Sequence, residues 1–202
     1  MKRATLWAVE PRPGPPPTSL RVVEPGRDGL APLVAAMGAD GDLAAVRLDR
    51  GCRAFGGWKE DALVAFGWVS TGAEWIGELG LEIRPAPGEA YIWNCVTLEP
   101  HRRQGHFQAL VRWIAAQAHA EGLSRLWIGS IDAVGTSALR AAGWTPVLRF
   151  TIRTLPWFRR LAVWSDEEAE PDLVRACRRA LFAGGQPVLG GSALGRASRR
   201  RH

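Results

Sequence analysis

The sequence predicts a mixed α/β fold in which strands cluster early and alternate with helices later. Two apolar runs, residues 52–58 and 62–70, are joined by three polar residues, which is typical of an antiparallel hairpin. Residues 105–121 place apolar side chains at the i, i+3, i+4, i+7 spacing of an amphipathic helix. The segments after this helix follow the order strand, helix, strand, so we expect helices packed on a mixed sheet.

Length and charge indicate one medium domain with extensions. The chain has 202 residues, of which 47% are hydrophobic, enough for a sizeable core. The formal net charge is +6, but residues 189–202 contribute four arginines and no acid. Because this terminal segment accounts for most of the surplus, the basic balance gives little support to a nucleic-acid partner.

The cysteines and the apolar runs indicate a cytoplasmic protein. The three cysteines are widely spaced and form no CxxC pair, which predicts a reducing compartment and no metal site. No apolar run approaches the ~20 residues of a membrane span. The N-terminus lacks the apolar core of a signal peptide, so we expect neither export nor membrane insertion.

The elements before the long helix follow from local patterns. Five prolines within residues 11–17 argue against a helix or a central strand, so residues 1–18 are expected to form an extended leader. Residues 19–25 predict a first strand, and residues 28–51 predict one or two helices interrupted at residues 38–41. After the hairpin, residues 76–98 contain two strand-like runs. In the first, Leu79, Leu81 and Ile83 alternate with Glu78 and Glu82, which gives one apolar and one acidic face.

The long helix and the segments after it complete the predicted domain. Gly122 is expected to end the helix. Residues 123–131 predict a strand, residues 136–143 a short helix, and residues 144–155 a final strand. Residues 171–182 predict another helix, with acids near its start and arginines later, as its dipole prefers. We therefore divide the chain into a leader (1–18), the domain (19–155), and a C-terminal helix with a basic tail (156–202).

The turn that opens the long helix has the composition of an anion site. Arg102, Arg103 and Gly105 lie where backbone N–H groups have no intrahelical partner and the helix dipole is positive. Glycine there would let a phosphate approach the backbone closely. The alternative is an arginine-rich turn that only faces water.

These residues resemble a known motif. The pattern Arg102-x-x-Gly105-x-Phe107 resembles Q/R-x-x-G-x-G/A, the pyrophosphate motif of the GNAT superfamily of N-acetyltransferases, with an apolar strand before it and an amphipathic helix after it. Further on, Asp132 and Gly135, followed by a short helix ending in Gly-Trp, resemble the family pattern N-x-x-S with a helix ending in G-F. Phe107, Asp132 and Gly135 depart from the usual residues.

The resemblance implies a fold and a cofactor. The fold would be a central, mostly antiparallel sheet with a splayed strand pair, flanked by helices. The cofactor would be acetyl-CoA, with its pantetheine arm against Cys95, Val96 and Thr97. Cys95 is expected to be a core residue, because the family transfers the acyl group without an acyl-enzyme. The remaining cofactor contacts would come from Arg102, Arg103, Gln104, Gly105, His106, Phe107 and Gln108.

The resemblance also suggests where the chemistry occurs. Tyr91 occupies the position of a glutamate in the histone-type branch, but a phenol is a poor base at neutral pH. Glu89 shares its strand face, so we expect Glu89 to accept the proton while Tyr91 orients the acceptor. The alternative is that Glu89 only closes the turn before the strand. Leu139 stands where many members have a tyrosine that protonates the leaving thiolate.

The implied function is transfer of acetyl from acetyl-CoA to a primary amine by direct attack on the thioester, in a bacterial-type enzyme. Glu78, Glu82 and Trp93 are expected to contact the amine, carried by a small molecule or a peptide; a solvated acidic strand face is the alternative. A CoA-binding module with little or no turnover is the second hypothesis. A nucleic-acid contact by the arginine tail is the third. The acceptor and a homodimer are left open.

Overall fold

The computed structural model describes residues 2–14, 19–131, 133–154, 157 and 159–182. Its first half contains β1 (Lys2–Val9), β2 (Arg21–Val23), η1 (Arg27–Gly29), α1 (Ala31–Met37), η2 (Gly38–Asp40), α2 (Leu43–Asp49), β3 (Arg53–Lys59), β4 (Ala62–Ser70), β5 (Glu74–Ile76) and β6 (Leu81–Ile83). Its second half contains β7 (Glu89–Thr97), η3 (Glu99–His101), α3 (His106–Ala120), β8 (Arg125–Ser130), α4 (Ala133–Ala141), β9 (Thr145–Thr154), β10 (Arg159–Ser165) and α5 (Pro171–Phe182).

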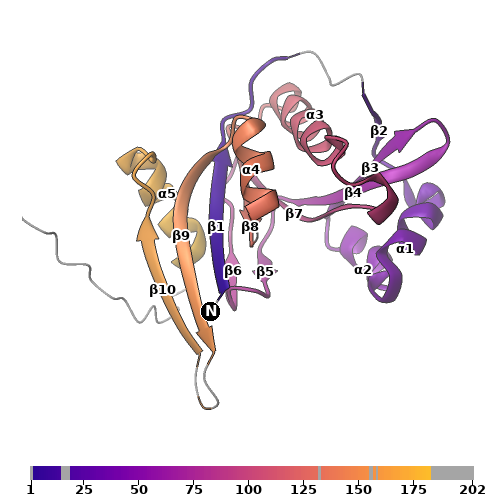
Figure 1. Cartoon of the computed structure of the whole chain (residues 1–202). Coiled ribbons are helices and arrows are strands. Elements are labelled where there is room, and N and C mark those ends of the chain that lie inside the picture. The colour runs from indigo at the N-terminus through magenta and orange to yellow at the C-terminus, as the bar shows by residue number, and fades with distance from the viewer. Residues whose placement is uncertain (1, 15–18, 132, 155–156, 158, 183–202) are drawn as a thin grey trace, which may run out of the picture.

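One eight-stranded sheet organises the described part of the chain, in the order β10-β9-β1-β8-β7-β4-β3-β2 (Figure 1). Every neighbouring pair in it is antiparallel except β7 and β8, which are joined by α3 and run parallel. A helical crossover is the usual way to connect parallel neighbours. This confirms the predicted mixed, mostly antiparallel sheet and the predicted hairpin, which is β3–β4.

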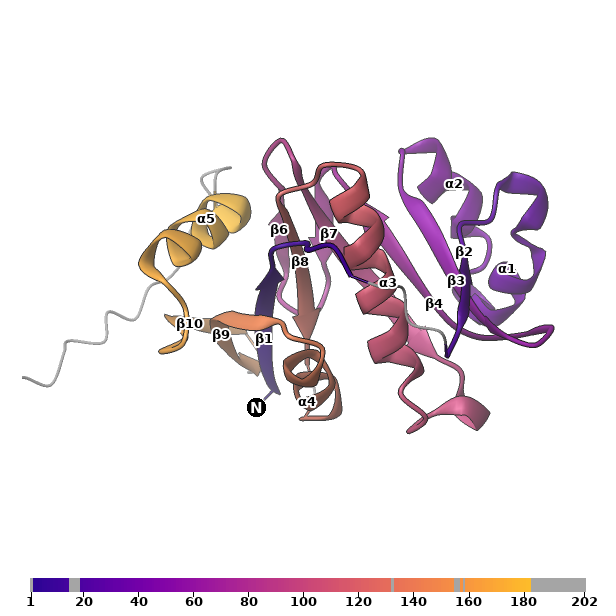
Figure 2. The same ribbon diagram turned by 90° about the horizontal axis from the view of Figure 1, so that it is seen from above.

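Helices cover both faces of the sheet (Figure 2). α3 and α4 pack on one face, where the predicted stripe of Leu110, Val111 and Ile114 is almost completely buried against the strands. The helices α1 and α2 pack on the other face beside β3 and β4, and α5 packs on that face beside β1 and β9. The predicted break at residues 38–41 separates α1 from α2.

The expected leader over residues 1–18 is wrong for its first half. Lys2–Val9 forms β1, which pairs with β8 on one edge and with β9 on the other. Leu6, Trp7 and Ala8 are each at most 2% exposed. The prolines all follow Val9, so a composition taken over eighteen residues concealed a proline-free strand of eight.

The C-terminal segment also belongs to the sheet. β10 pairs with β9 from Arg159 to Ser165, so the sheet continues past the expected boundary at residue 155. The predicted helix over residues 171–182 is confirmed as α5. The expected basic tail, residues 189–202, lies outside the described residues. Sequence patterns also missed β5, which forms a small ribbon with β6.

Candidate functional site

The two parallel strands β7 and β8 separate at the centre of the sheet. They pair only over residues 89–92 and 125–128, although β7 continues to Thr97 and β8 to Ser130. A cavity of about 290 Å³ opens where the strands part, lined from α3 by Phe107 and from α4 by Gly135 and Leu139. The splayed pair implied by the family resemblance is therefore present.

A β-bulge lies where β7 leaves β8. Asn94 has a φ of 46°, and the register between β4 and β7 shifts so that Asn94 and Cys95 lie opposite Gly67. An ideal Cβ on Gly67 would lie 2.7 Å from the Cys95 sulfur, so only glycine leaves room for this side chain. Because bulges bend the strand that contains them, this one accounts for the divergence of β7.

The bend leaves one backbone edge of β7 without a neighbouring strand. Beyond Ile92, β7 keeps its pairing with β4, where Val96 lies opposite Phe66 and Thr97 opposite Ala65. No described strand pairs with its other edge. Half-buried amide groups need partners, so this edge suits an extended ligand that carries amides of its own. The expected contacts Cys95, Val96 and Thr97 all lie on this segment.

Cys95 behaves as a packed residue in this arrangement. Its thiol donates a hydrogen bond to the Trp93 carbonyl, with a sulfur–oxygen distance of 3.8 Å. Burial raises the pKa of this thiol to about 12, so it stays protonated at neutral pH. A neutral thiol is a weak nucleophile, which supports the structural role expected for Cys95.

The turn between β7 and α3 contains the residues predicted to bind an anion. Gly105 is the N-cap of α3 with a φ of 81°, and Arg103 has a φ of 63°. The first hydrogen bond of α3 joins Ala109 N–H to the Gly105 carbonyl, and no side chain caps the helix. Within the described residues, the N–H groups of residues 106–108 therefore have no acceptor, as expected of a first helical turn.

The side chains of this turn differ in their surroundings. Arg102 is exposed, and its Nε donates to the Thr97 carbonyl at 3.3 Å, which ties the turn to the end of β7. The Gln104 amide donates to the Pro100 carbonyl. Phe107 packs in the core beneath α3 and also lines the cavity, as expected from its place on the apolar stripe. Gln108 is half-buried.

The side chain of His106 is buried. It is 5% exposed, and neither ring nitrogen has a hydrogen-bond partner among the described residues. Burial lowers the pKa of this imidazole, and the nearby Lys59 and His101 lower it further. Because the imidazole is buried, only the backbone N–H of His106 could make the expected cofactor contact.

The cavity lining contains three of the residues predicted to act on the acceptor: Glu78, Tyr91 and Trp93. An ideal Cβ on Gly129 would lie 3.5 Å from the Tyr91 hydroxyl, so this hydroxyl faces β8 where the strands part. Burial, and next the carboxylate of Glu78, raises the pKa of Tyr91 well above its ordinary value. Tyr91 is thus a hydrogen-bond donor at neutral pH and not a base.

Glu89 and Glu82 lie elsewhere. Both carboxylate oxygens of Glu89 are engaged, by Arg125 at 2.5 Å, by the Trp127 indole N–H at 2.7 Å, and by the Ala86 N–H at 3.3 Å. Glu89 is buried and does not line the cavity, so its contacts support the alternative of a turn-closing residue and not a proton acceptor. Glu82 pairs with Arg84 at 2.5 Å and is also outside the cavity lining.

The second family motif, around Asp132 and Gly135, lies only partly within the described residues. Leu139 is fully buried and lines the cavity, so an apolar side chain occupies the place expected from the sequence. Gly135 lines the cavity too, whereas Asp132 lies outside the described residues. Sequence analysis missed the contribution of β1, whose residues Ala4 and Leu6 line the cavity. Ala4, Leu6 and Ala8 alternate along the chain and are buried, and this alternation of apolar residues could have indicated a strand.

The described residues offer neither a metal cluster nor a membrane-spanning helix. In the described ranges, no three histidine, cysteine, aspartate or glutamate side chains gather closely enough to hold a metal ion. No helix in this part of the chain is long and apolar enough to cross a membrane.

Several solved structures resemble this one. A GNAT acetyltransferase from Colwellia psychrerythraea has a TM-score of 0.55 and 14% identity, over 72% of this chain and 53% of that one. A GCN5-related N-acetyltransferase from Sphaerobacter thermophilus has a TM-score of 0.52 and 13% identity, over 73% and 49% of the two chains. One from Kribbella flavida has a TM-score of 0.49 and 20% identity, over 71% and 54%. The chain thus spans about half the length of these structures.

The sequence itself was also compared with known families. A comparison with curated proteins gave no match. The model of the acetyltransferase (GNAT) family, however, matches residues 33–142, which run from α1 through the splayed strands to α4. More than half of the chain is covered, including the bulge, the turn between β7 and α3 and the long helix, and so this protein belongs to the GNAT acetyltransferase family.

Proposed function

We propose that this protein transfers an acetyl group from acetyl-CoA to a primary amine. The observation that carries the proposal is the free backbone edge of β7 beside a helix start whose N–H groups lack acceptors. An amide-bearing arm fits the first feature and a diphosphate fits the second. The residues present therefore suit acetyl-CoA, which when bound supplies an activated acetyl thioester.

The chain would hold this cofactor mainly through its backbone. N–H groups of residues 106–108 would bind the diphosphate, with Arg102 and Arg103 raising the local positive potential. The edge of β7 over residues 93–97 would pair with the arm and align the thioester with the incoming amine. Phe107 would close the cavity floor without blocking these donors.

Proton transfer is the step for which the side chains matter most. Glu78 is the one carboxylate among the described residues that line the cavity, so we assign it the role of proton acceptor for the amine, directly or through water. Tyr91, kept protonated by burial, would donate a hydrogen bond within the same cavity. Trp93 would form an apolar wall for the acceptor.

One observation favours a second candidate function. Leu139 presents an apolar side chain where many members place a hydroxyl that protonates the departing thiolate. If neither water nor Tyr91 supplies that proton, the protein would bind CoA with little turnover. Release of free thiol in the presence of a broad panel of amines would exclude this candidate.

The cofactor assignment is tested by calorimetric titration with acetyl-CoA. Gly105→Asn should weaken binding by about tenfold or more, because asparagine tolerates a positive φ but its side chain would occupy the phosphate approach. Gly122→Asn is the matched control: its φ is 78°, against 81° at Gly105, and an added Cβ meets nothing within 4 Å at either site. Absence of binding to the wild-type protein at about 1 mM ligand would refute the proposed function.

A further inference from the structure

Three adjacent strands expose a face that carries arginines. Residues of β1, β9 and β10 that point to this side lie in register: Thr5 beside Arg149 and Trp164, Arg3 beside Thr151 and Ala162, and Arg153 beside Arg160. We call these eight residues the arginine face. Its side of the sheet is opposite to the one covered by α5 (Figure 2). All four of its arginines are exposed.

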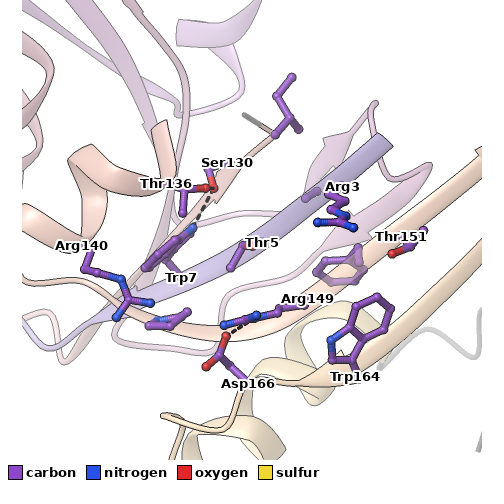
Figure 3. Close-up of a pocket in the computed structure, with 14 residues that line it drawn as sticks. Arg3, Thr5, Trp7, Ser130, Thr136, Arg140, Arg149, Thr151, Trp164 and Asp166 are labelled. Carbon is purple, nitrogen blue, oxygen red and sulfur yellow. Dashed lines mark hydrogen bonds and ion pairs between the residues drawn. The ribbon is translucent and has the colours of Figure 1, made fainter. Parts of the chain in front are cut away.

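The arginine face is hollowed into a groove. One hollow of about 460 Å³ runs over β1 and β9 and reaches Arg140 of α4, and a second of about 390 Å³ runs over β9 and β10. They share Thr151 and Trp164, so they form one continuous surface. Trp7 supports it from below, held by its indole hydrogen bond to Ser130 at 2.9 Å (Figure 3).

The charges of the groove are only partly neutralised. Five arginines line the two hollows, against one carboxylate, Asp166. Asp166 pairs with Arg149, and Arg140 pairs with Glu168. The remaining three, Arg3, Arg153 and Arg160, have no acidic partner within the described residues.

Two of these unpaired arginines face each other directly. Arg153 and Arg160 are cross-strand partners in the β9–β10 ladder. Like charges at directly opposite positions destabilise an antiparallel pair. An anion lying between the two guanidinium groups would remove this repulsion, so the arrangement points to a negatively charged ligand.

Trp164 adds an aromatic surface among these charges. It is 42% exposed and lies in the same row as Arg149, with Arg3 and Thr151 in the next row. In Figure 3 its ring borders the hollow beside Thr151 and Arg149. Stacking surfaces next to guanidinium groups are the combination that binds bases and phosphates of single strands.

We propose that the arginine face binds single-stranded nucleic acid, with a base on Trp164 and phosphates on Arg3, Arg153 and Arg160. The groove is open, spans about 10 Å across three strands and about 13 Å along β9, and so suits a segment of a polymer. A second copy of the chain is a poor occupant, because two arginine faces would repel each other. The groove borders the cavity between β7 and β8, but none of these four side chains lines that cavity, and the binding does not depend on acetyl transfer.

The proposal is tested with the full-length protein and a fluorescein-labelled single strand of about twelve mixed nucleotides, followed by fluorescence anisotropy. The double variant Arg153→Gln/Arg160→Gln should bind about tenfold more weakly. The slope of its logarithmic affinity against logarithmic salt concentration should become shallower by about 1.4. The control Arg178→Gln/Arg179→Gln removes the same charge from exposed positions on α5, on the other side of the sheet, and should change affinity less than about twofold. Residues 183–202 are present in every variant.

A second pair of variants separates stacking from charge. Trp164→Ala should lower affinity by about tenfold, and Trp164→Phe should restore most of it, because base stacking needs an aromatic ring.

The proposal would be overturned if the double variant on the arginine face and the control double variant on α5 lost equal affinity, or if the wild-type protein did not bind the single strand. Binding to phosphatidylcholine vesicles with about a quarter phosphatidylserine, with the same arginine dependence but without oligonucleotide binding, would overturn it in favour of a membrane surface.

Discussion

The cavity between β7 and β8 lies next to the groove on the arginine face, around β1 and the end of β8, yet the two differ in how they use charge. Both are lined by Ala4, Thr5, Ser130 and Ile131. Among the described residues, one carboxylate and no arginine or lysine line the cavity, whereas five arginines line the groove. A half-enclosed charge interacts strongly with its neighbours, while exposed charges are screened and must act together. Single substitutions should therefore have large effects in the cavity and small, salt-dependent effects on the face.

The largest effect is expected from Glu78, the one carboxylate that lines the cavity among the described residues. Glu78→Gln should lower kcat for acetyl transfer by about 10²–10⁴-fold, because general-base catalysis contributes this much. Steady-state rates at saturating acetyl-CoA and amine measure it.

Glu82→Gln is the matched control, since Glu82 pairs with Arg84 outside the cavity. We expect it to retain its rate within about twofold. A Glu78→Gln enzyme with wild-type kcat would remove Glu78 from the mechanism while leaving the cofactor site intact.

The next effect contrasts two tryptophans that line the same hollow. Trp7 is 1% exposed and Trp164 is 42% exposed. Trp7→Ala should reduce the free energy of unfolding by about 3–5 kcal/mol, through a cavity and a lost hydrogen bond to Ser130. Trp164→Ala should cost less than about 1 kcal/mol. Urea unfolding measures both, and equal losses would show that β1 is not the core strand described above.

These tryptophans also show which parts of the fold could be predicted from the sequence. The stripe of α3 and the β3–β4 hairpin depend on residues close together in the chain, and they were predicted correctly. The turn before α3 depends on equally local residues, but its role as an anion site stays a prediction. β1 depends on pairing with distant strands: Trp7 and Ser130 are 123 residues apart. Nothing near Trp7 in the sequence signals that partner, whereas the prolines that follow suggested a leader.

Glu89 shows the same limit within the candidate site. Its position on the strand face of Tyr91 follows from alternation alone, and that part was correct. Its partners Arg125 and Trp127 belong to β8, and the parallel register that places Arg125 opposite Glu89 is set by the crossover through α3. Local spacing could identify candidate carboxylates, but only the tertiary structure distinguishes a paired one from one that lines the cavity.

A smaller effect is expected from the buried base beside the cavity. The native state keeps His106 neutral because burial lowers its pKa, whereas the unfolded chain protonates it near the ordinary value of about 6.5. The unfolded state therefore binds more protons as pH falls below about 6.5, and stability should decrease by up to about 1.4 kcal/mol per pH unit from this group. His106→Leu should flatten this decrease in urea midpoints measured between about pH 7.5 and 5. An unchanged slope in His106→Leu would mean that other groups account for the acid sensitivity.

The smallest effect is expected on the arginine face itself, where Arg153 and Arg160 lie directly opposite each other. Arg160→Glu turns this repulsion into an attraction and should raise the free energy of unfolding by about 0.2–1 kcal/mol, with a gain that shrinks as salt is added. The free energy of unfolding of Arg160→Gln should lie between those of the wild type and Arg160→Glu. If Arg160→Glu stabilises the fold while weakening oligonucleotide binding, then the two wild-type arginines lower the stability of the sheet. Their arrangement is then explained by binding of an anionic ligand. A loss of stability would instead show that the two guanidinium groups do not repel each other, and the charge argument for the ligand would fail.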